Sequence, residues 1–111
     1  VLTFSILTIP ERESYLKQLL RSIAGMRLEP PPHVDIVYNR PLDDSLGDVI
    51  ERIRGFARGL PVEVYFNAGE TTIGAGRNLQ LSVCRTPLIA FIDDDLTLHD
   101  DIVPALLDTL A

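Results

Sequence analysis

The sequence predicts an α/β domain: a three-layer, Rossmann-like parallel sheet built from four βα units. Short apolar runs alternate four times with stretches whose apolar residues recur at helical spacing. The apolar runs are typical of strands that are covered on both faces, as in parallel sheets. The connections have ordinary lengths, so right-handed crossovers between neighbouring parallel strands are expected.

Each element has a local sequence signature. The expected strands are 2–9, 34–39, 61–67 and 87–92, and the expected helices are 12–25, 46–59, 77–85 and 100–111. Gly25 marks the end of the first helix, and the Gly- and Thr-rich segment 68–76 is expected to be a loop. The residues expected to face the core from the first two helices are Tyr15, Leu16, Leu19, Leu20, Ile23, Leu46, Val49, Ile50, Ile53 and Phe56.

Composition narrows the class of protein. The chain has 111 residues, enough for one domain with one core, and 46% of them are hydrophobic. A formal net charge of −6 argues against binding nucleic acid through a basic face. The one cysteine, Cys84, excludes an intrachain disulfide and suits a reducing compartment, so we expect a cytoplasmic protein. No apolar run reaches the ~18 residues of a membrane span.

Three consecutive carboxylates, Asp93, Asp94 and Asp95, follow the fourth apolar run. In open parallel sheets ligands bind beyond the carboxyl ends of the strands, so this triplet lies at the predicted binding edge. The segments expected to meet there are 10–13, 39–45, 67–78 and 93–95. Hard oxygen ligands suit Mg²⁺ or Mn²⁺, and a cation would remove the repulsion between the carboxylates. The alternative is a solvated loop that caps the next helix, although Asp100 or Asp101 already supplies a cap.

Three segments together resemble a known family: FSILTIPERESYLKQLLRSI, NAGETTIGAGRN and PLIAFIDDDLTLHDDIVPALL. They look like the nucleotide-binding half of GT-A fold glycosyltransferases, especially family two. The resemblance covers essentially the whole chain, and the joint order of the segments is more specific than any one of them. It implies transfer of a sugar, with inversion, from a nucleotide-diphosphate sugar to an acceptor, assisted by Mn²⁺ or Mg²⁺.

The resemblance also implies roles for individual residues. Thr8, Ile9, Pro10 and Arg12 would line the nucleotide pocket, and Arg77 would reach the base or the diphosphate. Asn78 would brace the loop, Asp93 would contact the ribose or base, and Asp95 would hold the metal. The expected substrate-binding residues are thus Thr8, Pro10, Arg12, Glu13, Asn39, Gly76, Arg77, Asn78, Asp93 and Asp94, and the expected metal ligands are Asp95 and Asp93.

Two features depart from the family pattern. Family members usually carry one or two acids after the second strand that read uracil, whereas this strand ends in Asn39 and acids follow only at Asp43 and Asp44. Either the loop folds back or base recognition differs. The general base of the family lies well downstream of the acidic cluster. Residues 1–111 are therefore expected to be the donor-binding portion of a transferase, truncated at the C-terminus and poorly active alone.

Other interpretations of the same residues stay open. FIDDDLTL also fits the first motif of haloacid dehalogenase-type phosphatases, with Asp93 as nucleophile and Asp95 as acid, although Leu96 replaces the expected glycine. The domain could instead be a non-catalytic metal- or ligand-binding module. Its exposed sheet edge could pair copies of the chain. Gly76 could serve only turn flexibility, and Arg77 could be a surface ion-pairing residue.

Overall fold

The computed structural model describes residues 2–26, 31–40, 46–67, 69, 71–98, 105 and 108. Strands β1 (Leu2–Thr8), β2 (His33–Tyr38), β3 (Val62–Phe66) and β4 (Leu88–Asp93) form one parallel sheet in the order β3-β2-β1-β4. The helices are α1 (Glu13–Ala24), preceded by the 3₁₀ turn η1 (Pro10–Arg12), α2 (Leu46–Ala57) and α3 (Ile73–Val83). The predicted three-layer parallel α/β fold is confirmed, whereas the expected helix 100–111 lies largely outside the described residues.

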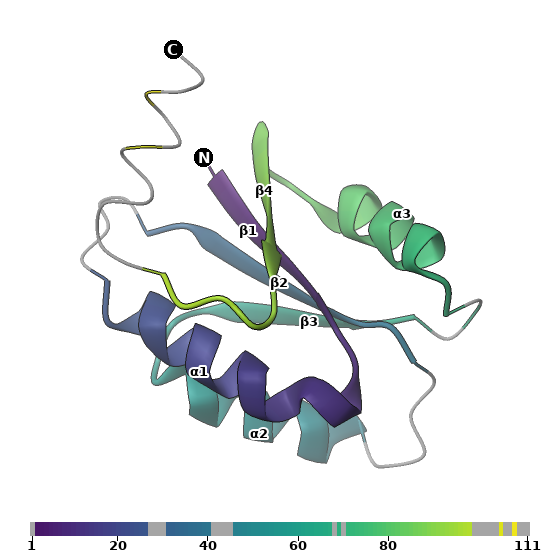
Figure 1. Ribbon diagram of the computed structural model, residues 1–111, viewed down its shortest axis with the longest axis horizontal. Coiled ribbons are helices and arrows are strands. Elements are labelled where there is room, and N and C mark those ends of the chain that lie inside the picture. Colours follow the sequence, from purple (N-terminus) through teal and green to yellow (C-terminus); the bar gives the residue numbers. More distant parts are fainter. Residues whose placement is uncertain are drawn as a thin grey trace.

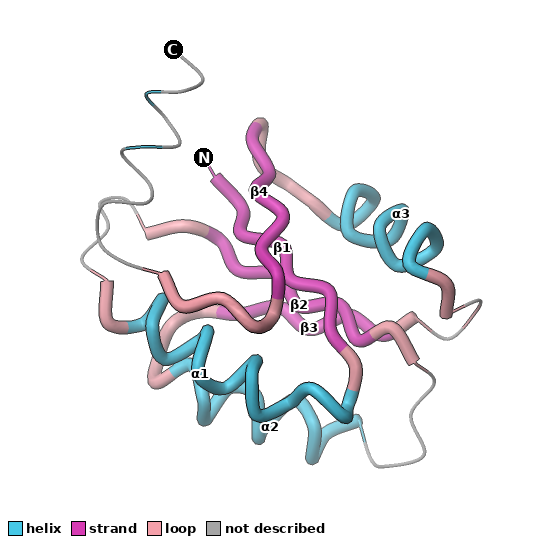
Figure 2. The backbone as a smooth tube through the Cα atoms, in the orientation of Figure 1, coloured by secondary structure: helices cyan, strands magenta, loops and turns pink. Residues whose placement is uncertain are grey.

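The helices cover opposite faces of the sheet. Figure 1 and Figure 2 show α1 and α2 together on one face and α3 on the other. The chain runs outward from β1 through β2 to β3, and then returns to place β4 on the other side of β1. Because crossovers are right-handed, the two directions of travel put their helices on opposite faces. The strand order therefore reverses at β1, and the crevice for a ligand is expected between the carboxyl ends of β1 and β4.

The two faces of the sheet differ in chemistry. Alternate residues of the strands pack against α1 and α2 in an apolar core that includes Phe4, Ile6 and Leu20, each fully buried. The face below α3 contains buried polar residues, Thr3, Ser5 and Asp35, beside apolar ones such as Val37. Gln80 of α3 donates from Nε2 to Ser5 Oγ at 3.0 Å, and buried polar groups need such partners.

The length and hydropathy of the described helices are insufficient for any of them to cross a membrane.

The third helix begins four residues before its predicted start. Thr72 caps it, because its Oγ1 accepts a hydrogen bond from the backbone N–H of Ala75 at 3.1 Å. Gly74 and Gly76 consequently belong to the helix and not to the preceding loop. Strand ends differ from prediction by at most one residue, which is within the usual uncertainty of such boundaries.

Two residues that were expected in the core lie at the surface. Tyr15 and Leu46 are 47% and 51% exposed, so these two predictions are wrong. Both lie in the first turn of their helices, before the first buried residues, Leu16 in α1 and Val49 in α2. Tyr15 instead carries the guanidinium of Arg12 over its ring, with 4.8 Å between the guanidinium carbon and the ring centroid.

Gly76 allows α3 to approach the sheet closely. A Cβ atom at this position would lie 2.7 Å from Leu7 Cδ1 and 2.9 Å from Asn39 Cγ. Asn39 cannot easily give way, because its amide is held by hydrogen bonds to the backbone carbonyls of Thr71 and Thr72. A Cβ atom at Gly74, two residues earlier, would have no neighbour within 4 Å.

We therefore expect opposite effects from alanine at these two glycines. Gly76→Ala should lower the free energy of unfolding by about 1–3 kcal/mol through overpacking. Gly74→Ala should raise it by up to ~1 kcal/mol, because alanine is the better helix former. Urea unfolding of the two variants tests this, and equal effects would contradict the close approach of α3.

A second acidic position, separate from the aspartate triplet, lies on the α3 face of β2, where Asp35 pairs in register with Ser5 of β1. Asp35 is 5% exposed and pairs in the sheet register with Glu63, which places two acids side by side. Burial raises the pKa of Asp35 above its ordinary value of 3.8, His33 counteracts this, and Glu63 adds to it. Since the folded pKa exceeds the unfolded one, the ionised Asp35 destabilises the fold.

Asp35→Asn should therefore raise the melting temperature at pH 7. Stability of the parent chain should fall as the pH rises from 3.8 through the raised pKa of the folded state, whereas the variant should lack this component. The difference between the two proteins should vanish below pH 3.8. Thermal unfolding between pH 3 and pH 8 measures it, and a variant that is less stable at pH 7 would show that the ionised carboxylate has a favourable role.

Candidate functional site

The carboxyl ends of the strands meet at one edge of the sheet, as predicted. In the register of the sheet Leu7 of β1 lies beside Asp93 of β4, and Thr8 lies beside Tyr38 of β2. Beyond the strands, the backbone N–H of Asn39 donates to the carbonyl of Thr8 at 2.8 Å. This edge also contains the point where the strand order reverses.

Two adjoining hollows open at this edge, with volumes of about 280 Å³ and 270 Å³. Both are lined by Leu7, Arg12, Ile73 and Asp94. The first hollow is completed by Arg77, Gln80, Ile92, Asp93 and Asp95, and the second by Thr8, Ile9 and Asn39. The first hollow is lined mainly by charged and polar side chains, whereas the second is mainly apolar. Small-molecule sites typically combine apolar surface with convergent polar groups.

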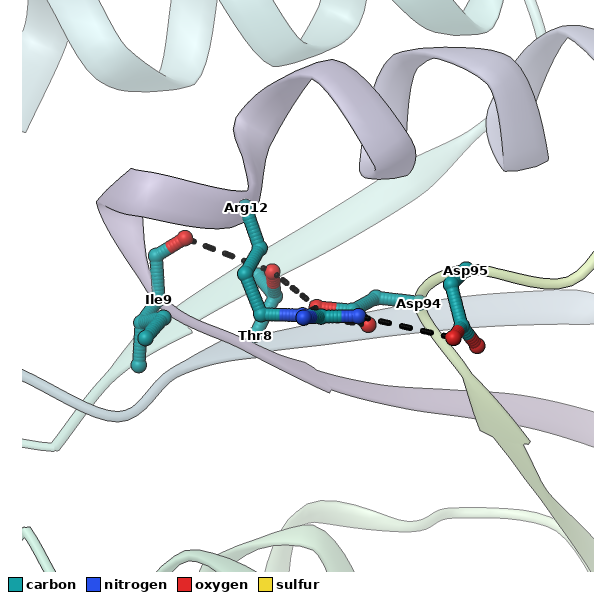
Figure 3. Close-up of polar contacts among 5 residues, drawn as sticks. All are labelled: Thr8, Ile9, Arg12, Asp94 and Asp95. Carbon is teal, nitrogen blue, oxygen red and sulfur yellow. Dashed lines mark hydrogen bonds and ion pairs between the residues drawn. The ribbon is translucent and has the colours of Figure 1, made fainter.

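Asp94 ties the segments around the hollows together (Figure 3). The residue is 6% exposed, and its carboxylate accepts a hydrogen bond from Thr8 Oγ1 at 2.9 Å. Arg12 Nε lies 2.9 Å from each of its oxygens. The middle aspartate of the triplet is thus paired with groups at the end of β1 and in η1, and its oxygens are already engaged.

Arg12 also reaches the third aspartate. Its Nη2 lies 3.6 Å from Asp95 Oδ2, so one guanidinium lies between two carboxylates. The hydrogen bond to Asp94 and the charge of that carboxylate raise the pKa of Arg12, which stays cationic. In this arrangement the triplet has an internal positive charge that offsets part of its repulsion.

Asp93 and Asp95 differ from Asp94 in exposure. Both are exposed, and within the described residues no side-chain hydrogen bond or ion pair holds Asp93. Strand alternation places Asp93 on the α3 face of β4, opposite to the face on which Asp94 meets Thr8. The triplet therefore supplies one buried anchor and two carboxylates that a ligand can reach.

The acidic residues fit a divalent cation only in part. Within the described part of the chain, no group of three or more His, Cys, Asp or Glu residues is arranged to hold a metal ion. Mg²⁺, however, commonly binds through one or two carboxylates and completes its shell with substrate phosphates and water. Asp93 and Asp95 match that smaller set of ligands.

A second cation faces the hollow from α3. Arg77 lines the first hollow, and its guanidinium carbon lies 4.4 Å from the ring centroid of Phe91 in β4. Such stacking on an aromatic face leaves the edge of a guanidinium free for anions. Arg12 and Arg77 thus flank the aspartates from two different elements.

Asn39 braces the loop that leads to α3. Its Nδ2 donates to the backbone carbonyls of Thr71 and Thr72, both at 3.1 Å, and its Oδ1 accepts from Asn67 Nδ2 at 2.7 Å. Bracing of this loop was expected from Asn78, which is exposed on α3. The side chain of Asn39 therefore lines the second hollow while its polar atoms serve the protein itself.

Comparison with known proteins identifies the family. The family model described as glycosyl transferase family 2 matches residues 6–111. The chain belongs to glycosyl transferase family 2. No curated protein sequence gives a significant match. Family 2 membership favours the transferase interpretation over the phosphatase alternative.

Solved structures confirm the predicted GT-A fold of this family 2 chain. A structure of S. aureus TarS 1-349 superposes with a TM-score of 0.73 at 19% sequence identity, and covers 98% of this chain and 32% of that one. TarS 1-349 in complex with UDP-GlcNAc gives a TM-score of 0.73, and its complex with UDP gives 0.74, both at 19% identity. The two complexes also match 98% of this chain, against 30% and 31% of theirs. The family 2 chain described here thus spans about a third of these TarS chains.

The hollows contain some of the predicted site residues and lack others. Thr8, Arg12, Asn39, Arg77 and the three aspartates line them. Glu13 is turned away, since it accepts a hydrogen bond from Tyr38 Oη at 3.2 Å and pairs with Arg52. Pro10, Gly76 and Asn78 are absent from the described lining of the two hollows, and Asp43 and Asp44 lie outside the described residues.

Sequence reasoning missed four residues that line the hollows: Leu7, Ile73, Gln80 and Ile92. A helix that begins at Ile73 would have revealed two of them, because Ile73, Arg77 and Gln80 recur at intervals of four and three along one helical face. Leu7 and Ile92 were assigned to buried strands in this family 2 chain, and their positions at the strand ends are what expose them to the hollow.

The anchoring of Asp94 by Thr8 can be tested through stability. Thr8→Val keeps the shape of the side chain but removes the donor, leaving a buried carboxylate oxygen with one partner fewer. We expect the free energy of unfolding to fall by about 1–3 kcal/mol. Thr97→Val, at an exposed position two residues after the triplet, is the control and should change it by less than ~0.5 kcal/mol. Equal values for the two variants in urea unfolding would contradict the anchoring role.

Proposed function

We propose that the chain forms the donor-binding part of a glycosyltransferase that transfers a sugar from a nucleotide-diphosphate sugar. The observation that carries the proposal is one juxtaposition. Two exposed carboxylates, Asp93 and Asp95, and two cations, Arg12 and Arg77, surround one hollow at the carboxyl edge of the sheet. Cations there suit a diphosphate, and an acid beside them suits the hydroxyl groups of a ribose or a sugar.

Each lining group has a role in this proposal. Arg77 and Arg12 bind the diphosphate, and Asp93 accepts hydrogen bonds from the ribose. Leu7, Ile73 and Ile92 supply apolar surface against the rings of the ligand. Asp95, with Asp93, would hold Mn²⁺ or Mg²⁺, which as a Lewis acid would stabilise the charge of the departing diphosphate.

Recognition of the donor's nucleobase concerns the position that follows β2. Asn39, where an acid is usual, has both polar atoms of its amide engaged by the protein. Recognition of the base through this side chain would require it to leave Thr71 and Asn67. Two of the similar TarS structures are complexes, one with UDP-GlcNAc and one with UDP, which makes a uridine nucleotide the first candidate for this chain.

Other parts of the reaction follow from the family resemblance alone. Inverting transfer needs a general base that deprotonates the acceptor hydroxyl. No described residue is assigned as that general base or as part of the acceptor-binding site. We propose that both belong to the whole enzyme, of which these residues form the donor-binding part. Pairing of copies through a sheet edge stays a prediction.

Thermal unfolding with Mn²⁺ and a panel of UDP, GDP, CDP and dTDP tests the proposal. At ten times its dissociation constant a nucleotide should stabilise the chain by ~1.4 kcal/mol, which corresponds to a rise in melting temperature of roughly 5–10 °C for a domain of this size. The rise should require Mn²⁺ and should be lost in Asp95→Ala. It should persist in Glu51→Ala, a change at an exposed acid of α2.

Two results would argue against this function. The absence of any shift with all four nucleotides would contradict a donor site in this chain. Stabilisation by beryllofluoride with Mg²⁺, without an effect of nucleotides, would instead support the phosphatase alternative.

A further inference from the structure

Arg12 makes two contacts of unequal kind with the aspartate triplet. Its Nε donates to both oxygens of Asp94 at 2.9 Å, whereas its Nη2 lies 3.6 Å from Asp95, beyond hydrogen-bond distance. Figure 3 shows the guanidinium lying beside Asp94 with its far end toward Asp95. The same side chain thus has a short contact at one end and a longer one at the other.

The two carboxylates also differ in their surroundings. The side chain of Asp94 is 8% exposed and has a second donor in Thr8, whereas that of Asp95 is 52% exposed. A pair between exposed groups is weak and easily exchanged, whereas a buried carboxylate that loses its partner is strongly disfavoured. Arg12 can therefore release Asp95 without releasing Asp94.

We propose that Arg12 is a positioning residue that couples the binding of a divalent cation to the binding of the nucleotide. This inference rests on the proposed donor-binding function. In the ligand-free chain Nη2 of Arg12 neutralises Asp95. A cation that takes Asp95 displaces this contact and frees the outer edge of the guanidinium, which then binds the diphosphate.

The coupling follows from the charges around Asp95. A cation that arrives alone competes with Arg12 for the carboxylate and is repelled by the guanidinium. A diphosphate that arrives with it gives the displaced guanidinium a new anionic partner, so the competition disappears. By linkage, the nucleotide must then increase the affinity for the cation by the same factor as the cation increases the affinity for the nucleotide.

Titration of Mn²⁺, followed by electron paramagnetic resonance of the free ion with and without UDP, measures this factor directly. The Mn²⁺–UDP complex formed without protein supplies the correction. In Arg12→Gln, Mn²⁺ alone should bind more tightly than to the parent chain, and the coupling factor should fall by up to about fivefold, the upper end of what exposed ion pairs contribute. Arg40→Gln is the matched control, because Arg40 follows β2 at the same edge and pairs with Glu11.

A second variant controls for destabilisation of the first, since Arg12→Gln leaves Asp94 buried without its cation. The double change Arg12→Gln and Asp94→Asn removes both charges, and it too should lose coupling. Unchanged coupling in the Arg12 variants would overturn the inference while the donor site stands. An equal fall in Arg40→Gln would also overturn it, because the effect would then be one of general charge. A parent chain that binds neither Mn²⁺ nor UDP would overturn the proposed function, and this inference with it.

Discussion

The buried carboxylate of Asp94 holds together the edge of the sheet that we propose to bind the donor. It accepts hydrogen bonds from Thr8 at the end of β1 and from Arg12 in η1, while it belongs to the turn after β4. Backbone hydrogen bonds from Asn39 to Thr8 and from Asn67 to Tyr38 hold the segments that leave β2 and β3, whereas the segment after β4 is tied to β1 through the side chain of Asp94. Asp94 provides that connection at the point where the strand order reverses.

A second set of contacts does the same on the other side of β1. Asn39 connects the end of β2 to the loop before α3, and Gly76 lets α3 lie close above Leu7 and Asn39. The position of Arg77 depends on this close approach, because it follows Gly76 directly in the helix. Polar contacts of this kind lie beside apolar ones, such as Leu7 under Gly76, on the α3 face.

Patterns in the sequence were sufficient for the architecture and for the sheet edge at which the two hollows lie. Apolar runs and helical spacing predicted the parallel sheet, and the carboxyl-edge rule brought Thr8, Arg12, Arg77 and the aspartates together. The division of roles within the triplet was not predictable from three identical residues. It depends on strand alternation and on the hydrogen-bond donors Thr8 and Arg12, which come near Asp94 only in the tertiary structure.

Other misses have similar causes. The start of α3 was placed too late because two glycines suggested a loop, while the cap at Thr72 that overrides them was not recognised. Tyr15 was assigned to the core by its spacing, although in the first turn of α1 it pairs with Arg12 instead. The expectation that Asn39 contacts substrate stays a prediction, since this residue lines the second hollow. Its additional bracing role was missed, because only the positions of Thr71, Thr72 and Asn67 reveal it.

The central claim is that the carboxyl edge between β1 and β4 binds a cation together with a nucleotide. Paramagnetic broadening of backbone amide signals by Mn²⁺, in ¹⁵N-labelled chain with UDP present, tests it most directly. The account predicts that broadening centres on Asp93 to Asp95 and extends to Thr8 and Arg77. Broadening centred on Asp35 and Glu63, in the neighbouring strands β2 and β3, or no broadening at all, would contradict it.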